Sequence, residues 1–217
     1  MRVGIICEGS SDFVLLEALA LDLLSADECV QLHPDFDKLK ATGDSSHAPG
    51  WQGVRKFLQT SSGPALALAV FDVIVIQVDA SIRKLRELKL PQPEEWADEA
   101  EPLDALCDHV KSWATDGLPE SAIIALPRED IEAWLVAVHT RIRNVESLGN
   151  PAGELVAQGI IETVNGKPNK RAEAYRALAV PLVKLARDAK KVKAIPELER
   201  FVNKLRARAR KVRGSKR

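Results

Sequence analysis

The sequence predicts an α/β fold, a three-layer sandwich with a parallel central sheet, followed by a basic helical C-terminal region. Short apolar runs alternate along the chain with segments whose apolar residues recur at helical spacing. The run FDVIVIQVD is apolar at nearly every position, as in a strand that is covered on both faces. Strands that alternate with helices are typical of a parallel sheet. Beyond residue 150 the chain changes to basic, helix-forming sequence.

The first expected elements are a strand and a helix joined by a tight turn. Residues 2–7, RVGIIC, form the strand, and the apolar positions of the helix continue to Leu23. Ser10 or Ser11 is expected to cap the helix, since both have hydroxyls that can accept from the first free N–H groups. Gly9 is expected to permit the sharp turn between the two elements.

The middle of the chain continues the alternation and ends in a helical pattern, REDIEAWLVAVHTRI, with three carboxylates in its first turns. Its other expected elements are a short strand at 30–32, a polar turn-rich loop at 33–50, a helix at 51–58 broken by SSGP at 61–64, a strand at 73–78, a charged helix at 82–88, an acidic stretch with prolines at 91–102, a helix at 103–114 and a strand at 122–126. Basic helices are expected at 170–189 and 196–209, before a frayed end from 211.

Carboxylates follow the expected strands. Glu8, Asp79 and the acidic group at 129–132 each come just after a strand end, where parallel sheets bind ligands. We therefore expect these side chains to gather on one rim. Carboxylates that are brought together repel one another, and a divalent cation relieves that repulsion. Oxygen ligands favour Mg²⁺ or Mn²⁺, which serve phosphoryl transfer.

A structural role is the alternative for several of these acids. Asp12, Glu129 and Asp130 are expected in first turns of helices, where a negative charge stabilises the helix dipole. Glu132 lies one turn further on, beside Trp134, which is expected in the core. A helix-terminal role explains Glu132 less well.

The charge of the chain is unevenly distributed although its net charge is zero. Residues 164–217 contain 18 Lys and Arg against 4 Asp and Glu, which leaves 13 basic and 27 acidic residues before them. A basic tail predicts an anionic partner, most often nucleic acid, bound through salt-sensitive phosphate contacts. Neutralisation of the acidic body, within one fold or a homo-oligomer, is the alternative. The candidate nucleic-acid-binding residues are Lys167, Lys170, Arg171, Arg206, Arg208, Arg210, Lys211 and Arg213.

Other features exclude several classes of protein. The three cysteines lack CxxC spacing and favour neither a disulfide framework nor a zinc site, as in a cytoplasmic protein. No apolar run approaches the roughly 20 residues that a bilayer requires, so no membrane partner is expected. The chain has no GxxxxGK[ST] or GxGxxG phosphate cradle.

Five segments carry a resemblance to a known family. EGSSDFVLLEAL resembles the first motif of Toprim domains, in the variant of OLD-family nucleases and of a small uncharacterised Toprim-like family associated with phage defence. VIVIQVDAS lies where that family has a strand ending in Asp-x-Asp, and LPREDIEAWLVA is similar to its third motif. AEAYRALAVPLVKLA and IPELERFVNKLR are similar to its helical tail. The resemblance implies a Toprim-like Rossmannoid domain at residues 1–145 and a basic helical region at 146–217 that packs on it or extends from it.

The resemblance also implies roles for site residues. It assigns Glu8 as a metal ligand or general acid/base, Asp12 as a second metal-site carboxylate, Asp79 as the principal Mg²⁺ ligand and Glu132 as an additional ligand. The catalytic set is then Glu8, Asp79 and Glu132. Ser81 stands where the family has its second aspartate, which argues against a two-metal site.

Three functions remain open at this stage. The first is a Mg²⁺-dependent nuclease, a defence effector that works with an ABC- or SMC-type ATPase partner. In it, Glu129 or Asp130 replaces the missing carboxylate. The second is a catalytically weakened subunit that binds nucleic acid or a partner. The third is hydrolysis of a nucleotide or other small phosphate at the same metal site.

Overall fold

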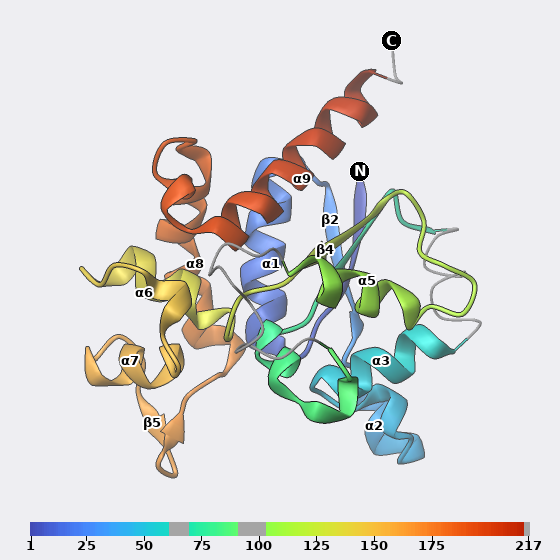
Figure 1. Cartoon of the computed structure of the whole chain (residues 1–217), viewed down its shortest axis with the longest axis horizontal. Helices are drawn as coiled ribbons and strands as arrows, with labels where there is room; N and C mark the ends of the chain where they lie inside the picture. The colour runs from blue at the N-terminus through green and yellow to red at the C-terminus, as the bar shows by residue number, and fades with distance from the viewer. Residues whose placement is uncertain (61–69, 91–102, 215–217) are drawn as a thin grey trace.

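A parallel sheet forms the centre of the molecule. The computed structural model describes residues 1–60, 70–90 and 103–214 (Figure 1). Within these residues, four strands pair in parallel in the order β2-β1-β3-β4. They are β1 (Arg2–Ile6), β2 (Glu28–His33), β3 (Val73–Gln77) and β4 (Ala122–Ala125). The expected α/β class with a parallel sheet is confirmed.

Helices cover both faces of this sheet. Alternate residues of a strand point to opposite faces, so Val75 of β3 lies in one apolar core and Ile76 in the other. The described helices of the first core are α1 (Ser10–Leu23), α6 (Glu132–His139), α7 (Pro151–Ala157), α8 (Ala172–Arg187) and α9 (Pro196–Gly214). Those of the second core are α3 (Trp51–Gln59) and α5 (Asp104–Ser112). Figure 1 shows α1 and α8 on one side of the strands and α3 and α5 on the other.

The turn between β1 and α1 differs from the expected one. Gly9 is the N-cap of α1, but the cap has no side-chain hydrogen bond, so the prediction of a serine cap was wrong. Ser11 instead donates its hydroxyl to Asp12 at 3.2 Å. The backbone of Gly9 is extended, with φ −154°, and a Cβ there would make only ordinary contacts. Gly9 is therefore not required for the turn.

The segment at 33–50, predicted as a loop, contains regular structure. It holds α2 (Phe36–Thr42) and a 3-10 turn, η1 (Ser45–His47). The Asp35 carboxylate accepts from Lys38 N at 3.0 Å and caps α2, and Gly43 ends the helix in the left-handed conformation. Asp35 and Gly43 are typical cap residues and could have predicted this helix. It was missed because α2 buries no residue, so no apolar face marks it in the sequence.

Two other helix predictions need correction. Residues 82–88 lie in two short 3-10 turns, η2 (Ala80–Lys84) and η3 (Arg86–Leu88), rather than in an α-helix. Helix α6 begins only at Glu132, so Glu129 and Asp130 precede it and are not dipole partners in its first turn. The SSGP break and the acidic stretch lie outside the described residues.

The C-terminal region packs on the sheet domain. Its elements are η5 (Val145–Ser147), α7 (Pro151–Ala157), the hairpin of β5 (Thr163–Val164) and β6 (Lys167–Pro168), α8, η6 (Val192–Ala194) and α9. Tyr175 and Phe201 are fully buried in the same core as β1 and α1, and the ring of Phe201 stacks on Trp134. Helix α9 continues through residue 214, beyond the predicted start of fraying.

No helix in the described ranges is both long and apolar enough to span a bilayer.

Candidate active site

Carboxylates converge at the carboxyl ends of three neighbouring strands. Glu8 follows β1, Asp79 follows β3 and Asp130 follows β4, while Asp12 lies in the first turn of α1 and Glu132 begins α6. Because β1, β3 and β4 are adjacent and parallel, their carboxyl ends meet at one edge. We call these five residues the carboxylate cluster.

Glu8 and Asp79 are joined through Gln77. The backbone N–H of Asp79 donates to Glu8 Oε1 at 2.7 Å, and the backbone N–H of Glu8 donates to Gln77 Oε1 at 3.1 Å. Gln77 Nε2 then donates to Asp79 Oδ1 at 2.8 Å. Gln77 is fully buried and was missed from the sequence. The sequence signal for Gln77 was a single polar residue within the apolar run VIVIQV.

The start of α3 forms a second support for Glu8. Gly50 N donates to the Glu8 carbonyl at 2.8 Å, and the N–H of Trp51 stabilises the Glu8 carboxylate. Gly53 allows the preceding loop to lie this close, since a Cβ there would come within 1.8 Å of the Ala48 carbonyl oxygen. The loop before α3 therefore forms a wall of the site.

Burial and mutual repulsion raise the pKa of Glu8, Asp12, Asp79 and Asp130. Burial raises the pKa of Glu8 to about 7, although backbone N–H groups oppose the shift. Burial, followed by the charges of Glu132 and Glu8, raises the pKa of Asp12 to about 8. Burial and Glu132 raise the pKa of Asp130 to about 7, and burial and Glu8 raise that of Asp79 well above its usual range. These groups share protons near neutral pH unless a cation neutralises them.

Glu132 has an internal counter-ion. Its carboxylate is 1% exposed, and Oε1 accepts from the Tyr175 hydroxyl at 2.7 Å and lies 2.8 Å from Lys170 Nζ. Burial lowers the pKa of Lys170, but Glu132 outweighs this and raises it above the ordinary value. Tyr175 was missed, although it is the only tyrosine of the chain and the only aromatic residue of its helix. The structure thus places Lys170, a predicted nucleic-acid ligand, in the cluster.

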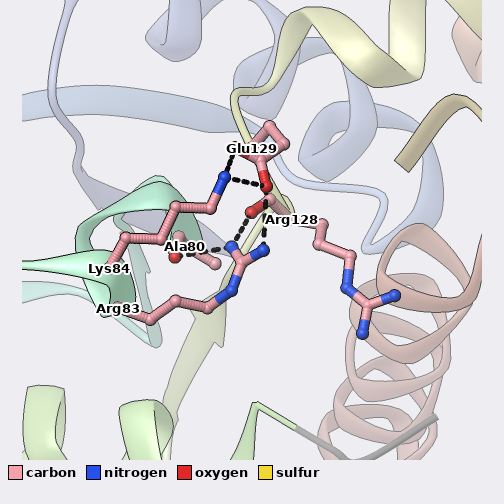
Figure 2. Close-up of polar contacts among 5 residues, drawn as sticks. All are labelled: Ala80, Arg83, Lys84, Arg128 and Glu129. Atoms are coloured by element: carbon pink, nitrogen blue, oxygen red, sulfur yellow. Dashed lines mark hydrogen bonds and ion pairs between the residues drawn. The ribbon is translucent and has the colours of Figure 1, made fainter. Parts of the chain in front are cut away.

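Glu129 is held apart from the cluster by two cations (Figure 2). Arg83 Nη2 lies 2.8 Å from its Oε1, and Lys84 Nζ lies 2.6 Å from its Oε2. Arg83 also donates to the carbonyls of Ala80 and Arg128, which fixes the turn after β4. A carboxylate neutralised in this way has little need of a metal, so we leave Glu129 out of the metal set.

The cluster fits a hard divalent cation by its donor chemistry. All its donors are oxygens, and Asp130 Oδ1 is buried without a hydrogen-bond partner among the described residues. In the part of the chain that the structure describes, no three His, Cys, Asp or Glu side chains are already arranged to hold an ion. Hydrogen bonds and Lys170 set the side-chain positions seen here.

Several predicted nucleic-acid-binding residues of α9 have structural partners. Arg206 Nη2 donates to the Ala186 carbonyl at 2.8 Å and caps the end of α8. Arg208 Nη2 donates to the Asp72 carbonyl at 3.0 Å, and Lys211 pairs with Glu120. Of the others, Lys167 lies in β6, Arg171 precedes α8, Arg210 is exposed, and the Arg213 side chain is outside the described part.

Comparison of the chain with protein-family models, with curated proteins and with solved structures finds no match.

Proposed function

We propose that the protein is a Mg²⁺- or Mn²⁺-dependent nuclease with a Toprim-like domain, acting on nucleic-acid phosphodiesters. The convergence of carboxylates with raised pKa at the carboxyl ends of adjacent parallel strands carries the proposal. The resemblance of EGSSDFVLLEAL and LPREDIEAWLVA to Toprim motifs supports the family assignment. On that resemblance alone we also propose a role in phage defence with an ATPase partner of ABC or SMC type.

The residues of the cluster would divide the work. Asp12, Asp79 and Asp130 would hold the cation, which when bound neutralises phosphate charge and activates the attacking oxygen. Glu8, with a pKa of about 7, is suited to take up a proton near neutral pH. Gln77 would keep Asp79 oriented, because its amide donates to Oδ1. Asp12 and Glu132 are buried, which strengthens the electrostatic contacts that they make.

A second candidate function is a subunit that binds nucleic acid or a partner with little or no catalysis. Ser81 replaces the family's second aspartate, and Glu129 is occupied by Arg83 and Lys84. Glu132 is likewise paired with Lys170. Fewer carboxylates then remain for metal than the family motif implies, which is the observation in favour of this candidate.

Cleavage of labelled single- and double-stranded DNA and RNA, with Mg²⁺, Mn²⁺ or EDTA, tests the proposal. Asp79→Asn should reduce metal-dependent cleavage by about 100-fold or more, because it removes a charge that holds the cation. Asp37→Asn, on the exposed face of α2, is the matched control and should cleave like the wild type. Absence of cleavage by the wild type, or undiminished cleavage by Asp79→Asn, contradicts the nuclease. Nucleic-acid binding without cleavage supports the second candidate.

A further inference from the structure

A basic groove lies between α9 and the outer edge of β4, which pairs with no further strand among the described residues. Strand β4 is an edge strand, and its Ala125 carbonyl faces β3, where it accepts from Val78 N at 3.2 Å. Backbone groups of successive strand residues point to opposite sides, so those of Ile124 face the outer edge. There Lys204 Nζ donates to the Ile124 carbonyl at 3.4 Å. Helix α9 runs beside this edge and projects past it (Figure 1).

The groove contains a pocket of about 290 Å³. Its lining residues are Glu120, Ala122, Ile123, Lys204, Ala207, Arg208 and Lys211. Lys204, Arg208 and Lys211 are spaced four and three residues apart, so their side chains share one face of α9. From Lys204 to Lys211 this face extends about 10 Å along the helix axis.

The positive charge of this pocket is incompletely neutralised. Lys204 and Arg208 donate to the uncharged carbonyls of Ile124 and Asp72, and among the described residues neither forms an ion pair with a carboxylate. Lys211 pairs with Glu120, so the lining has three cations against one carboxylate and a net charge of +2. The Nε–H of Arg208 is buried and lacks an acceptor in the described structure.

The groove is separate from the carboxylate cluster. Arg208 contacts Asp72, which precedes β3, and Lys211 contacts Glu120, which precedes β4. The cations therefore lead from the middle of β4 towards the amino ends of the strands, whereas the cluster lies at the carboxyl ends. A ligand in the groove would be held outside the reacting centre.

We propose that this groove binds the phosphodiester backbone of single-stranded nucleic acid. The proposal rests on the proposed function in that the bound strand would be the substrate. A concave pocket of about 290 Å³ has room for one small part of a strand, and a flexible single strand can bend into it, whereas a duplex is too stiff to do so. None of the described lining residues is aromatic, so binding comes from phosphate charge and is independent of sequence.

Fluorescence anisotropy with a labelled 20-nucleotide single strand in EDTA tests the groove without cleavage. The double variant Lys204→Gln/Arg208→Gln removes both charges but keeps a polar side chain at each position. We expect binding to weaken about tenfold at low salt and the slope of log K against log salt to fall by about 1.4 in magnitude, since each single-strand phosphate contact contributes about 0.7. Lys204→Arg/Arg208→Lys should bind like the wild type, which separates charge from folding.

The control variant Lys38→Gln/Lys40→Gln removes the same amount of charge from exposed side chains of α2. This helix lies at the bottom of Figure 1, whereas α9 projects at the top. The proposal is overturned if the groove variant binds no more weakly than this control. It is also overturned if duplex binds as tightly as single strand, or if inorganic phosphate competes as well as oligonucleotide at equal phosphate concentration. If the wild type cleaves nucleic acid and the groove variant binds as well as the wild type, the groove proposal fails and the nuclease proposal holds. If binding depends on the groove but the wild type does not cleave, the nuclease proposal fails and the groove proposal holds.

Discussion

The carboxylate cluster and the α9 groove each bring like charges together, and the repulsion between those charges is reduced in different ways. In the groove, Lys204 and Arg208 bind neutral carbonyls near the surface, where solvent screens their repulsion. In the cluster, Asp12 and Glu132 are buried and the other acids are half-buried, so repulsion is relieved by protons, by backbone N–H groups and by Lys170. The acids are thus neutralised within the fold, whereas Lys204 and Arg208 form no ion pair with a carboxylate among the described residues.

The largest expected effect is on stability as a function of pH. The raised pKa of Asp12, about 8, means that the folded protein keeps a proton that the unfolded chain releases above about pH 4. This stabilisation is present at low pH and is lost as pH rises through 8. The unfolding free energy in EDTA should therefore fall between pH 5 and 8 by about 1.4 kcal/mol per pH unit for each such proton.

Urea denaturation at each pH measures this slope, and Asp12→Asn should flatten it. An unfolding free energy that stays constant or rises over this range would show that Asp12 is ionised in the folded protein without metal, and it would contradict the proton that we assign to this carboxyl.

The next largest effect on the unfolding free energy is expected for Arg83, whose ion pair holds Glu129 apart from the cluster. Arg83→Met leaves a carboxylate that is 12% exposed with Lys84 alone, and it removes a donor from two carbonyls. We expect the unfolding free energy to drop by about 3 kcal/mol. Lys84→Met, whose side chain is 48% exposed, should cost less than about 1 kcal/mol. Equal costs for the two variants would argue that Glu129 has no buried structural role.

Removal of the partners of Glu132 should have a smaller effect. Tyr175→Phe and Lys170→Met each leave a buried carboxylate without one contact, at a cost of about 2 kcal/mol. The costs should not add, since both partners bind the same oxygen. Lys167→Met, on the exposed hairpin, is the control. Additive losses in thermal or urea unfolding would contradict a shared site.

The smallest effect is expected at Arg206, which tests whether α9 is uniformly a binding helix. Arg206→Met removes a donor from the carbonyls at the end of α8 and should cost about 1 kcal/mol. It should weaken binding of a single strand no more than a single lysine change on α2 does. A loss of affinity as large as that of the groove variant would make Arg206 a phosphate ligand as well.

The strands and the position of the cluster could be predicted because they depend on local patterns. VIVIQVD is apolar at almost every position, and Glu8 and Asp79 follow their strands directly. Parallel pairing then requires the strand ends to meet. The failures fall where the local pattern was weak: α2 buries no residue, and the turns of η2 are set by Arg83 reaching the loop after β4.

The sequence by itself determined the class of fold, the acidic rim and the basic tail, because periodicity, strand ends and composition can be read along the chain. Only the tertiary structure decided which charges are used and which remain. It assigned Lys170 to Glu132 and Arg83 to Glu129, and it left Lys204 and Arg208 on carbonyls. Such pairings depend on burial and on contacts between residues far apart in sequence, and no local pattern encodes them.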